Sequence, residues 1–202
     1  VRGFNVFRQS NTMYYLTGFE APHAYLLLHG RRRQAILYVQ HRNPSRERNE
    51  GKTLSFEDAE LIKQLTGIEE VKALEDMPRD WVYGGLVRPP HPIIYTPFSP
   101  AETGTDSRDE LLRYQSSVTN DPWDGRPSRE GQFVNLIKER YPQFEIRDLS
   151  PILDNMRNIK SEAEIALIRR ASQLSGLGLM EAIRSTEPGV YEYQLEASAR
   201  YI

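Results

Sequence analysis

Apolar residues recur at helical spacing over the last quarter of the chain, downstream of a Ser161–Glu164 pair. The serine hydroxyl and the glutamate carboxylate, three residues apart, form the capping-box pattern that begins a helix. Apolar and small residues then cover two neighbouring faces, which predicts a largely buried helix. The Pro188–Gly189 pair predicts the end of that helix, and a second helix is predicted from about Tyr191.

Short apolar runs and amphipathic stretches alternate before this region. The predicted strands are rich in aliphatic and aromatic residues and comprise residues 12–19, 24–28, 35–40, 93–95 and 144–149, with a short extended stretch at Val71. The predicted helices comprise a helix capped by Thr53 or Ser55 that runs to Gly67, residues 74–82, a helix capped by Asp106 and a helix over 133–141. A polar turn at 29–34 joins the second and third strands in a hairpin. This alternation indicates an α/β layer domain over residues 1–153, in which helices cover a sheet.

The last predicted helix meets the end of the given sequence. Its apolar positions Leu195, Ala199 and Ile202 need a covering layer, and no residues follow to provide one. This predicts that the sequence is a piece of a longer protein. It also predicts that the isolated piece dimerises through the exposed apolar faces of its last two helices, leaves these helices mobile, or aggregates.

The composition is that of a globular protein and excludes several classes. The chain has 202 residues, 39% of them hydrophobic and 27% charged, and its net charge of −2 gives no indication of a nucleic-acid partner. No apolar run approaches the ~18 residues needed to cross a bilayer, and the start of the sequence lacks the layout of a secretory signal. We therefore expect no membrane partner and a cytoplasmic location. The absence of cysteine excludes disulfides, thiolate metal sites and a cysteine nucleophile.

The polar residues provide no catalytic or metal-binding candidate. The histidines lack the spacing of three or four residues that one helix face needs for a metal: His23, His29, His41 and His91. Asp121 and Asp124 resemble a calcium loop only faintly, because Pro122 interrupts them and the closing glutamate is missing. Three serines lack the glycine-flanked elbow of a nucleophile: Ser10, Ser55 and Ser99. We expect caps and turns at these positions, and the substrate-binding residues are unknown.

A basic cluster between residues 29 and 52 is the strongest remaining anomaly. Its basic residues far outnumber Glu47 and Glu50: they are Arg31, Arg32, Arg33, Arg42, Arg46, Arg48 and Lys52. Such a patch attracts acidic peptides or phosphate, but no glycine-rich phosphate loop accompanies it and stacking aromatic residues are few. A solvated hairpin is the favoured interpretation.

Two regions of the sequence resemble the Xaa-Pro aminopeptidase (aminopeptidase P) family. Residues 6–20, VFRQSNTMYYLTGFE, resemble the opening motif of the family's amino-terminal domain. Residues 148–165, DLSPILDNMRNIKSEAEI, resemble the hinge into its catalytic pita-bread domain, and residues 187–197, EPGVYEYQLEA, resemble that domain's first helices. The resemblance implies a mixed sheet flanked by helices over 1–153, followed over 154–202 by the truncated start of an α+β pita-bread domain.

The resemblance also implies a metallopeptidase that removes the amino-terminal residue from a peptide with proline in the second position. It implies two divalent cations, typically manganese, which activate a bridging water. The family's metal ligands and catalytic histidines lie beyond the equivalent of Ile202, so we assign no catalytic or metal-binding residue in this chain and expect the segment alone to be inactive. The family's amino-terminal domain borders the catalytic cleft and takes part in assembly, which implies a homodimer or homotetramer.

One departure from the family pattern falls inside the basic cluster. Where many relatives carry Trp-x-Gly-Arg, this chain has Asn49 and Lys52 at the positions of the tryptophan and the arginine. In relatives whose tryptophan reaches a neighbouring subunit's active site, this change implies a different outer substrate pocket or oligomer contact. Two other interpretations stay open: a non-catalytic relative that binds peptides or protein partners, and a related dipeptidase or other pita-bread hydrolase.

Overall fold

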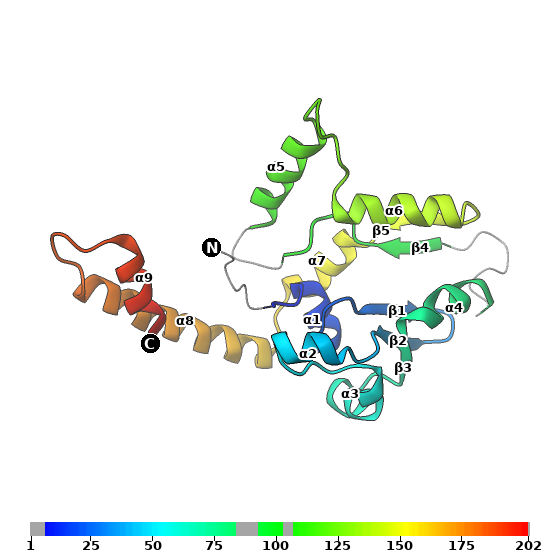
Figure 1. Ribbon diagram of the computed structural model, residues 1–202, viewed down its shortest axis with the longest axis horizontal. Coiled ribbons are helices and arrows are strands. Elements are labelled where there is room, and N and C mark those ends of the chain that lie inside the picture. Colours follow the sequence, from blue (N-terminus) through cyan, green and yellow to red (C-terminus); the bar gives the residue numbers. More distant parts are fainter. Residues whose placement is uncertain (1–6, 84–92, 103–106, 202) are drawn as a thin grey trace. The chain divides into compact units, whose positions relative to one another are not determined.

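The computed structural model describes residues 7–83, 93–102 and 107–201 (Figure 1). The chain divides into two compact units, Val1–Pro151 and Ile152–Ile202. The first unit contains two small sheets with helices around them, and the second is helical. The fold class predicted from the sequence, a mixed sheet flanked by helices, is confirmed. The functional division into domains at 1–153 and 154–202 stays a prediction.

The larger sheet has three strands in the order β1-β2-β3: Tyr25–His29, Gln34–Val39 and Glu70–Ala73. Strands β1 and β2 form the predicted antiparallel hairpin, in which Tyr25 faces Tyr38. Strand β3 returns parallel to β2, with Ile36 opposite Glu70. The sheet is therefore mixed.

Strand β2 is the centre of this unit because both of its faces are buried. Leu37 and Val39 are 0% and 1% exposed, and they belong to a core cluster that includes Phe19 and Ile62. The alternate residues Ile36 and Tyr38 are buried on the opposite face. A strand buried on both faces reads as a continuous apolar run, which is the pattern that predicted it.

The stretch predicted as a strand at 12–19 is instead a helix, α1 (Asn11–Thr17). The Ser10 side chain accepts a hydrogen bond from the backbone N–H of Met13, which caps the first turn. Gly18 closes the helix in the left-handed conformation at φ 62°, where its N–H donates to the carbonyl of Tyr14. These two caps outweigh the strand preference of a run rich in tyrosine and threonine.

Further helices follow the hairpin. Helix α2 (Pro44–Glu50) comes directly after β2, and a 3-10 turn (Phe56–Asp58) leads into α3 (Ala59–Thr66). After β3, a second 3-10 turn (Leu74–Asp76) leads into α4 (Met77–Tyr83). The helices predicted over 55–67 and 74–82 are thus confirmed, whereas α2 is an additional helix inside the basic cluster.

The smaller sheet pairs two parallel strands, β4 (Ile93–Thr96) and β5 (Glu145–Asp148). Helices α5 (Arg108–Thr119) and α6 (Arg129–Arg140) connect them, as predicted. The cap of α5 is Ser107, whose side chain accepts from the N–H of Glu110, so the prediction of Asp106 as the cap is wrong; Asp106 itself lies outside the described residues.

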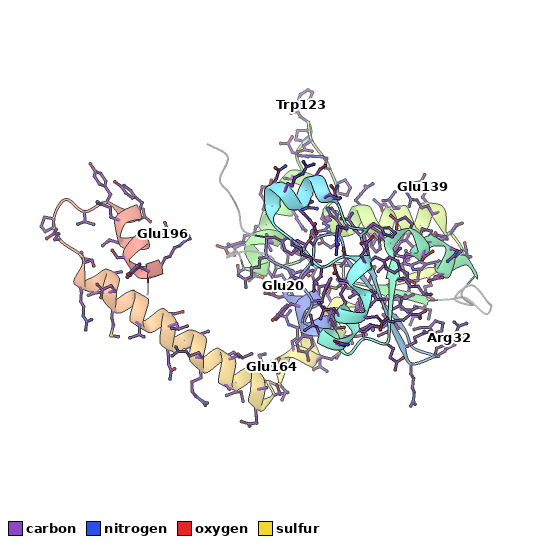
Figure 2. All side chains as sticks on the ribbon, turned by 60° about the horizontal axis from the view of Figure 1, so that its bottom comes forward. Glu20, Arg32, Trp123, Glu139, Glu164 and Glu196 are labelled. Atoms are coloured by element: carbon purple, nitrogen blue, oxygen red, sulfur yellow. The ribbon has the colours of Figure 1, made fainter. Side chains whose placement is uncertain are left out.

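The connection between α5 and α6 presents the most exposed aromatic side chain among the described residues. Trp123 is 96% exposed at the tip of this connection (Figure 2). The other tryptophan, Trp81 of α4, is 7% exposed and packs its ring 5.6 Å from that of Tyr141. The two indoles of the chain therefore lie in opposite environments.

Helix α7 (Ser150–Asn158) spans the boundary between the two units, where the family resemblance implies a hinge. The second unit then contains α8 (Glu162–Arg184) and α9 (Glu192–Tyr201). The capping box predicted at Ser161 is present, because its hydroxyl accepts from the N–H of Glu164 while the Glu164 carboxylate accepts from the N–H of Ser161.

The prediction that α8 is largely buried is wrong for the described chain. Gly178 is the one buried residue of this helix, and Leu167 and Ile183 are 72% and 65% exposed. The glycine lies where α9 crosses α8: a Cβ atom on Gly178 would lie 2.7 Å from the carbonyl oxygen of Ala199. The close approach of the two backbones thus requires glycine at this position.

Candidate functional site

The segment between β2 and α3 leaves the sheet and returns to it. We call residues 41–55 the α2 excursion. Its two ends meet where the N–H of Phe56 donates to the carbonyl of Gln40 at 2.9 Å. Compact surface loops whose ends are close together are frequently functional. The excursion also contains Asn49 and Lys52, the departures from the family pattern.

The first contacts at the base of the excursion are made by His41 and Arg42. The Nδ1 atom of His41 lies 2.7 Å from Oε1 of Glu57, and the backbone N–H of Arg42 donates to the other oxygen of the same carboxylate at 2.8 Å. The Arg42 guanidinium binds both oxygens of Asp58, at 3.0 and 3.1 Å. Two consecutive residues after β2 are therefore tied to two consecutive residues of the 3-10 turn.

The electrostatics of this base follow from the same contacts. The hydrogen bonds from His41 and from the backbone of Arg42 lower the pKa of Glu57 to about 2. The hydrogen bond to Glu57 raises the pKa of His41 above its ordinary value of 6.5. Near pH 6 the pair is therefore an imidazolium and a carboxylate in direct contact.

Helix α2 itself is held by polar groups. The Asn43 side-chain oxygen accepts from the N–H groups of Ser45 and Arg46, each at 3.1 Å, and caps the helix. Arg46 pairs with Glu50 one turn later at 2.5 Å. None of the helix residues is buried. Helix α2 therefore presents a polar, charged surface to its surroundings.

A small hollow lies between the excursion and the Ala21–Pro22 turn. Its lining also includes Gln40, just before the excursion, and residues from both ends of the excursion and from α2: His41, Arg42, Asn43, Arg46, Glu47, Thr53, Leu54 and Ser55. The hollow has a volume of about 30 Å³, enough for about one or two water molecules. It is too small for a peptide, so the excursion is a candidate binding surface rather than an enclosed active site.

The basic cluster does not form one patch. Three of its arginines, 31–33, lie at the tip of the β1–β2 hairpin, where Figure 2 shows Arg32. The others follow β2 at its far end, and the six residues of that strand span roughly 20 Å. Arg42 and Arg46 are moreover paired with acidic side chains. The hairpin is solvated, but the second half of the cluster builds α2 and its base.

The other polar positions singled out from the sequence hold turns and caps. Ser10 caps α1, and Ser55 forms a capping box with Asp58. The backbone N–H of Ser99 donates to Oγ of Ser150. The hydroxyls of Ser10 and Ser55 thus serve helix caps, and Ser99 takes part in a contact through its backbone.

The aspartates and histidines singled out from the sequence likewise do not come together in one site. Asp121 accepts from the N–H of Trp123, and Asp124 pairs with Arg126. His23 is exposed, His29 accepts from the N–H of Arg32 at the hairpin tip, and His91 lies outside the described residues. Over residues 7–83, 93–102 and 107–201, no three histidine, aspartate or glutamate side chains gather as a group able to hold a metal.

Glu57 and Asp58 are the contact partners of His41 and Arg42, and reasoning from the sequence did not identify them. A signal for one of them is present, since Ser55 and Asp58 have the spacing of a capping box, and the box forms. Their contacts with His41 and Arg42 cross 16 residues of sequence. Such contacts depend on the return of the chain to the sheet and have no local pattern.

Comparisons with known proteins agree with this arrangement. Residues 2–82 match the family described as aminopeptidase P, N-terminal domain. A curated Xaa-Pro aminopeptidase from Haemophilus influenzae is 28% identical over 198 residues, which are 95% of this chain and 37% of that protein. The Xaa-Pro aminopeptidase of Escherichia coli is 24% identical over 96% of this chain and 40% of its own length.

Solved structures show the same fold. A protein of Bacillus anthracis, provisionally described as an aminopeptidase P, superposes with a TM-score of 0.72 at 21% sequence identity. The superposed region comprises 100% of this chain and 43% of the Bacillus anthracis chain. Proline aminopeptidase P II of Yersinia pestis gives a TM-score of 0.63 at 22% identity, over 100% and 42% of the two chains.

The chain thus spans about two fifths of the length of the relatives that it matches. The matched residues 2–82 contain the three-stranded sheet and the whole α2 excursion. Sequence motifs, family match and fold agree: residues 2–82 belong to the aminopeptidase P N-terminal domain family, and nearly the whole chain is similar to Xaa-Pro aminopeptidases.

Proposed function

We propose that this chain is part of a metal-dependent Xaa-Pro aminopeptidase, which removes the amino-terminal residue of a peptide when proline is the next residue. The observation that carries the proposal is the alignment of 95% of this chain with an Xaa-Pro aminopeptidase, rather than with one isolated module of it. An alignment of this length extends well beyond the matched residues 2–82 and into the second unit.

In this proposal, the segment supports assembly and borders the substrate cleft of the whole enzyme. The polar surface of α2 supports this role. The helix has no buried residue, and hydrogen bonds at the base of the excursion hold it in place, so it is available for contacts outside its own unit. A homodimer or homotetramer is the proposed assembly. Asn49, in place of the tryptophan that many relatives carry, would then change the outer substrate pocket or the oligomer contact.

The two divalent cations, proposed to be manganese, do not fit the described residues. These residues contain no cluster of three potential ligands, so we derive no step of the reaction through a metal here. The proposal assigns the cations to the remaining part of the enzyme, and it predicts that the 202-residue chain alone is inactive.

The described residues also contain no helix long and apolar enough to cross a membrane. The proposed location is the cytoplasm, on the ground of the sequence pattern alone.

The test is an assay of peptide cleavage by the purified full-length protein. We expect release of the first residue from an Xaa-Pro-Xaa peptide, dependent on manganese and abolished by a chelator. The matched peptide with alanine in place of proline serves as the control, and the 202-residue chain should release nothing from either peptide. Light scattering on the same sample gives the oligomeric state.

Each alternative has its own outcome in this test. A non-catalytic relative would bind the proline peptide without cleaving it at any metal concentration. A dipeptidase would cleave Xaa-Pro but not the tripeptide. Cleavage by the 202-residue chain would overturn the assignment of the metal pair to other residues.

A further inference from the structure

The position of α2 depends on the base of its excursion. No residue of the helix is buried, so packing of the helix contributes little to holding it. The contacts that fix it lie at its base, where Arg42 pairs with Asp58 and reaches Glu47 of α2 with its Nε at 3.7 Å. A change in the charges of the base therefore acts on the whole helix.

His41 lies at the centre of these charges. Its ring contacts Glu57 at 2.7 Å through Nδ1, while Nε2 lies 4.0 Å from Oε2 of Glu75 in the second 3-10 turn. The Phe56 ring packs edge-on against it, with ring centroids 5.1 Å apart. The imidazole thus joins the end of β2 to both 3-10 turns.

The charged groups that face His41 are mostly acidic. The first 3-10 turn supplies Glu57, next to Asp58, and the second supplies Glu75 and Asp76. Arg42 is the neighbouring cation, but its guanidinium is bound to Asp58 and Glu47. A protonated His41 compensates the acidic groups of both turns, whereas a neutral ring keeps one hydrogen bond and leaves their mutual repulsion uncompensated.

We propose that His41 is a pH-dependent latch, which fixes the α2 excursion when the imidazole is protonated and loosens it when the imidazole is neutral. The pKa shifts of the pair agree with this geometry. The folded pKa of His41 is raised above 6.5, so its contribution is complete below 6.5 and is lost as the pH rises through the raised value. The pKa of Glu57 is lowered to about 2 from 4.5, so its contribution is complete above 4.5 and is lost as the pH falls toward 2.

The latch is therefore fully closed between about pH 4.5 and 6.5 and opens on the alkaline side. It follows from contacts within residues 41–76 and does not depend on the proposed peptidase activity. A surface that is ordered in mild acid and mobile in mild alkali binds a partner with a matching pH dependence.

Hydrogen exchange tests the latch directly. We would measure the protection of the Glu47 and Gly51 amides, which donate within the excursion, at pH 5.5 and pH 8.5 after correction for intrinsic exchange. Because the neutral ring no longer compensates the acidic groups of the two turns, we expect the protection of both amides to be lower at pH 8.5 than at pH 5.5. In His41→Gln, which keeps a donor but does not titrate, protection should be the same at both pH values.

His23→Asn is the matched control, because it removes an exposed histidine elsewhere in the same unit. It should leave the pH dependence intact. Persistence of the full pH dependence in His41→Gln would overturn the latch, as would flat protection in the unmodified protein. An NMR titration of the unmodified protein is independent of any variant: a His41 pKa above 6.5 supports the proposal, and a value at or below 6.5 overturns it.

Discussion

The hydroxyl of Tyr38 donates a hydrogen bond of 2.9 Å to Oδ2 of Asp80, the same oxygen that accepts from Nζ of Lys72 at 2.8 Å. Tyr38 lies on the central strand and is 0% exposed, so its hydroxyl has no access to water. Burial and the hydrogen bond to Asp80 raise its pKa far above the ordinary value. The bond is therefore a partly buried polar contact between the sheet and α4.

Tyr38→Phe should destabilise the first unit by about 1–2 kcal/mol, because Asp80 loses a buried donor while the ring still fills its place. Urea unfolding followed by circular dichroism measures the loss. Tyr14→Phe is the control, since Tyr14 is 52% exposed and should change stability by less than about 0.5 kcal/mol. Equal effects of the two variants would contradict the role of the bond.

Asp80 also predicts the acid sensitivity of this unit. Burial raises the pKa of its carboxyl, but the hydrogen bonds from Lys72 and Tyr38 outweigh burial and lower the pKa below 3.8. A lowered folded pKa gives stability that is complete above 3.8 and is lost as the pH falls through the lowered value. Asp80→Asn should be less stable than the unmodified protein at pH 7, and the difference should shrink toward pH 2 in urea titrations. A constant difference over that range would be incompatible with this account.

The cap of α2 gives a local prediction. Asn43→Ala removes the acceptor of two N–H groups and should destabilise α2 by about 1 kcal/mol, whereas Asn43→Asp retains an acceptor. Hydrogen exchange should show faster exchange in α2 of the alanine variant, with α3 unchanged. Ser45→Ala leaves the capping oxygen in place and serves as the control.

The contact between α8 and α9 predicts opposite effects of an alanine substitution at two neighbouring glycines. Gly178→Ala places a methyl group 2.7 Å from the backbone oxygen of Ala199, which should cost about 1–3 kcal/mol and loosen α9. Gly176→Ala meets open space on the same helix and should stabilise it by about 0.5–1 kcal/mol. Exchange protection of the α9 amides should therefore move in opposite directions in the two variants. A gain of protection in both would disprove the close approach.

Exposed apolar residues of α8 predict the behaviour of the isolated 202-residue chain. Leu179 and Ile183, one turn apart, are 62% and 65% exposed. Replacing both with glutamate should reduce self-association in sedimentation velocity, and removal of residues 158–202 should do the same. Gln173→Glu adds charge on another side of the helix and should have little effect. Unchanged association in the double variant would show that a different surface drives it.

Much of the fold was predictable because its signals are local. The β1–β2 hairpin follows from two apolar runs and a polar turn, and α8 follows from the capping box at Ser161. The error at α1 has a physical reason. A short run rich in tyrosine and threonine favours a strand, and here the capping hydrogen bonds at both ends stabilise a helix instead. Helix α2 carries no apolar face, so it has no periodicity to detect.

The candidate site was less predictable than the fold. His41 contacts Glu57, and Arg42 contacts Asp58, only because the chain returns to the sheet after α2. Neither contact has a characteristic spacing in the sequence. The burial of α8 was overestimated because periodicity shows which face is apolar but not whether another element covers it. Patterns along a sequence thus predict elements better than they predict the partners of those elements.

Because the two tryptophans differ in exposure, their intrinsic fluorescence should report on two separate events. Trp81 is 7% exposed beside Tyr141, so the blue emission of a shielded indole should disappear when the first unit unfolds. Trp123 is 96% exposed, so its red emission should be nearly the same in the folded and unfolded states and should shift only when another molecule covers it. With two tryptophans in the sequence, a Trp123→Phe variant isolates the folding signal, and a Trp81→Phe variant isolates the docking signal, without any added dye.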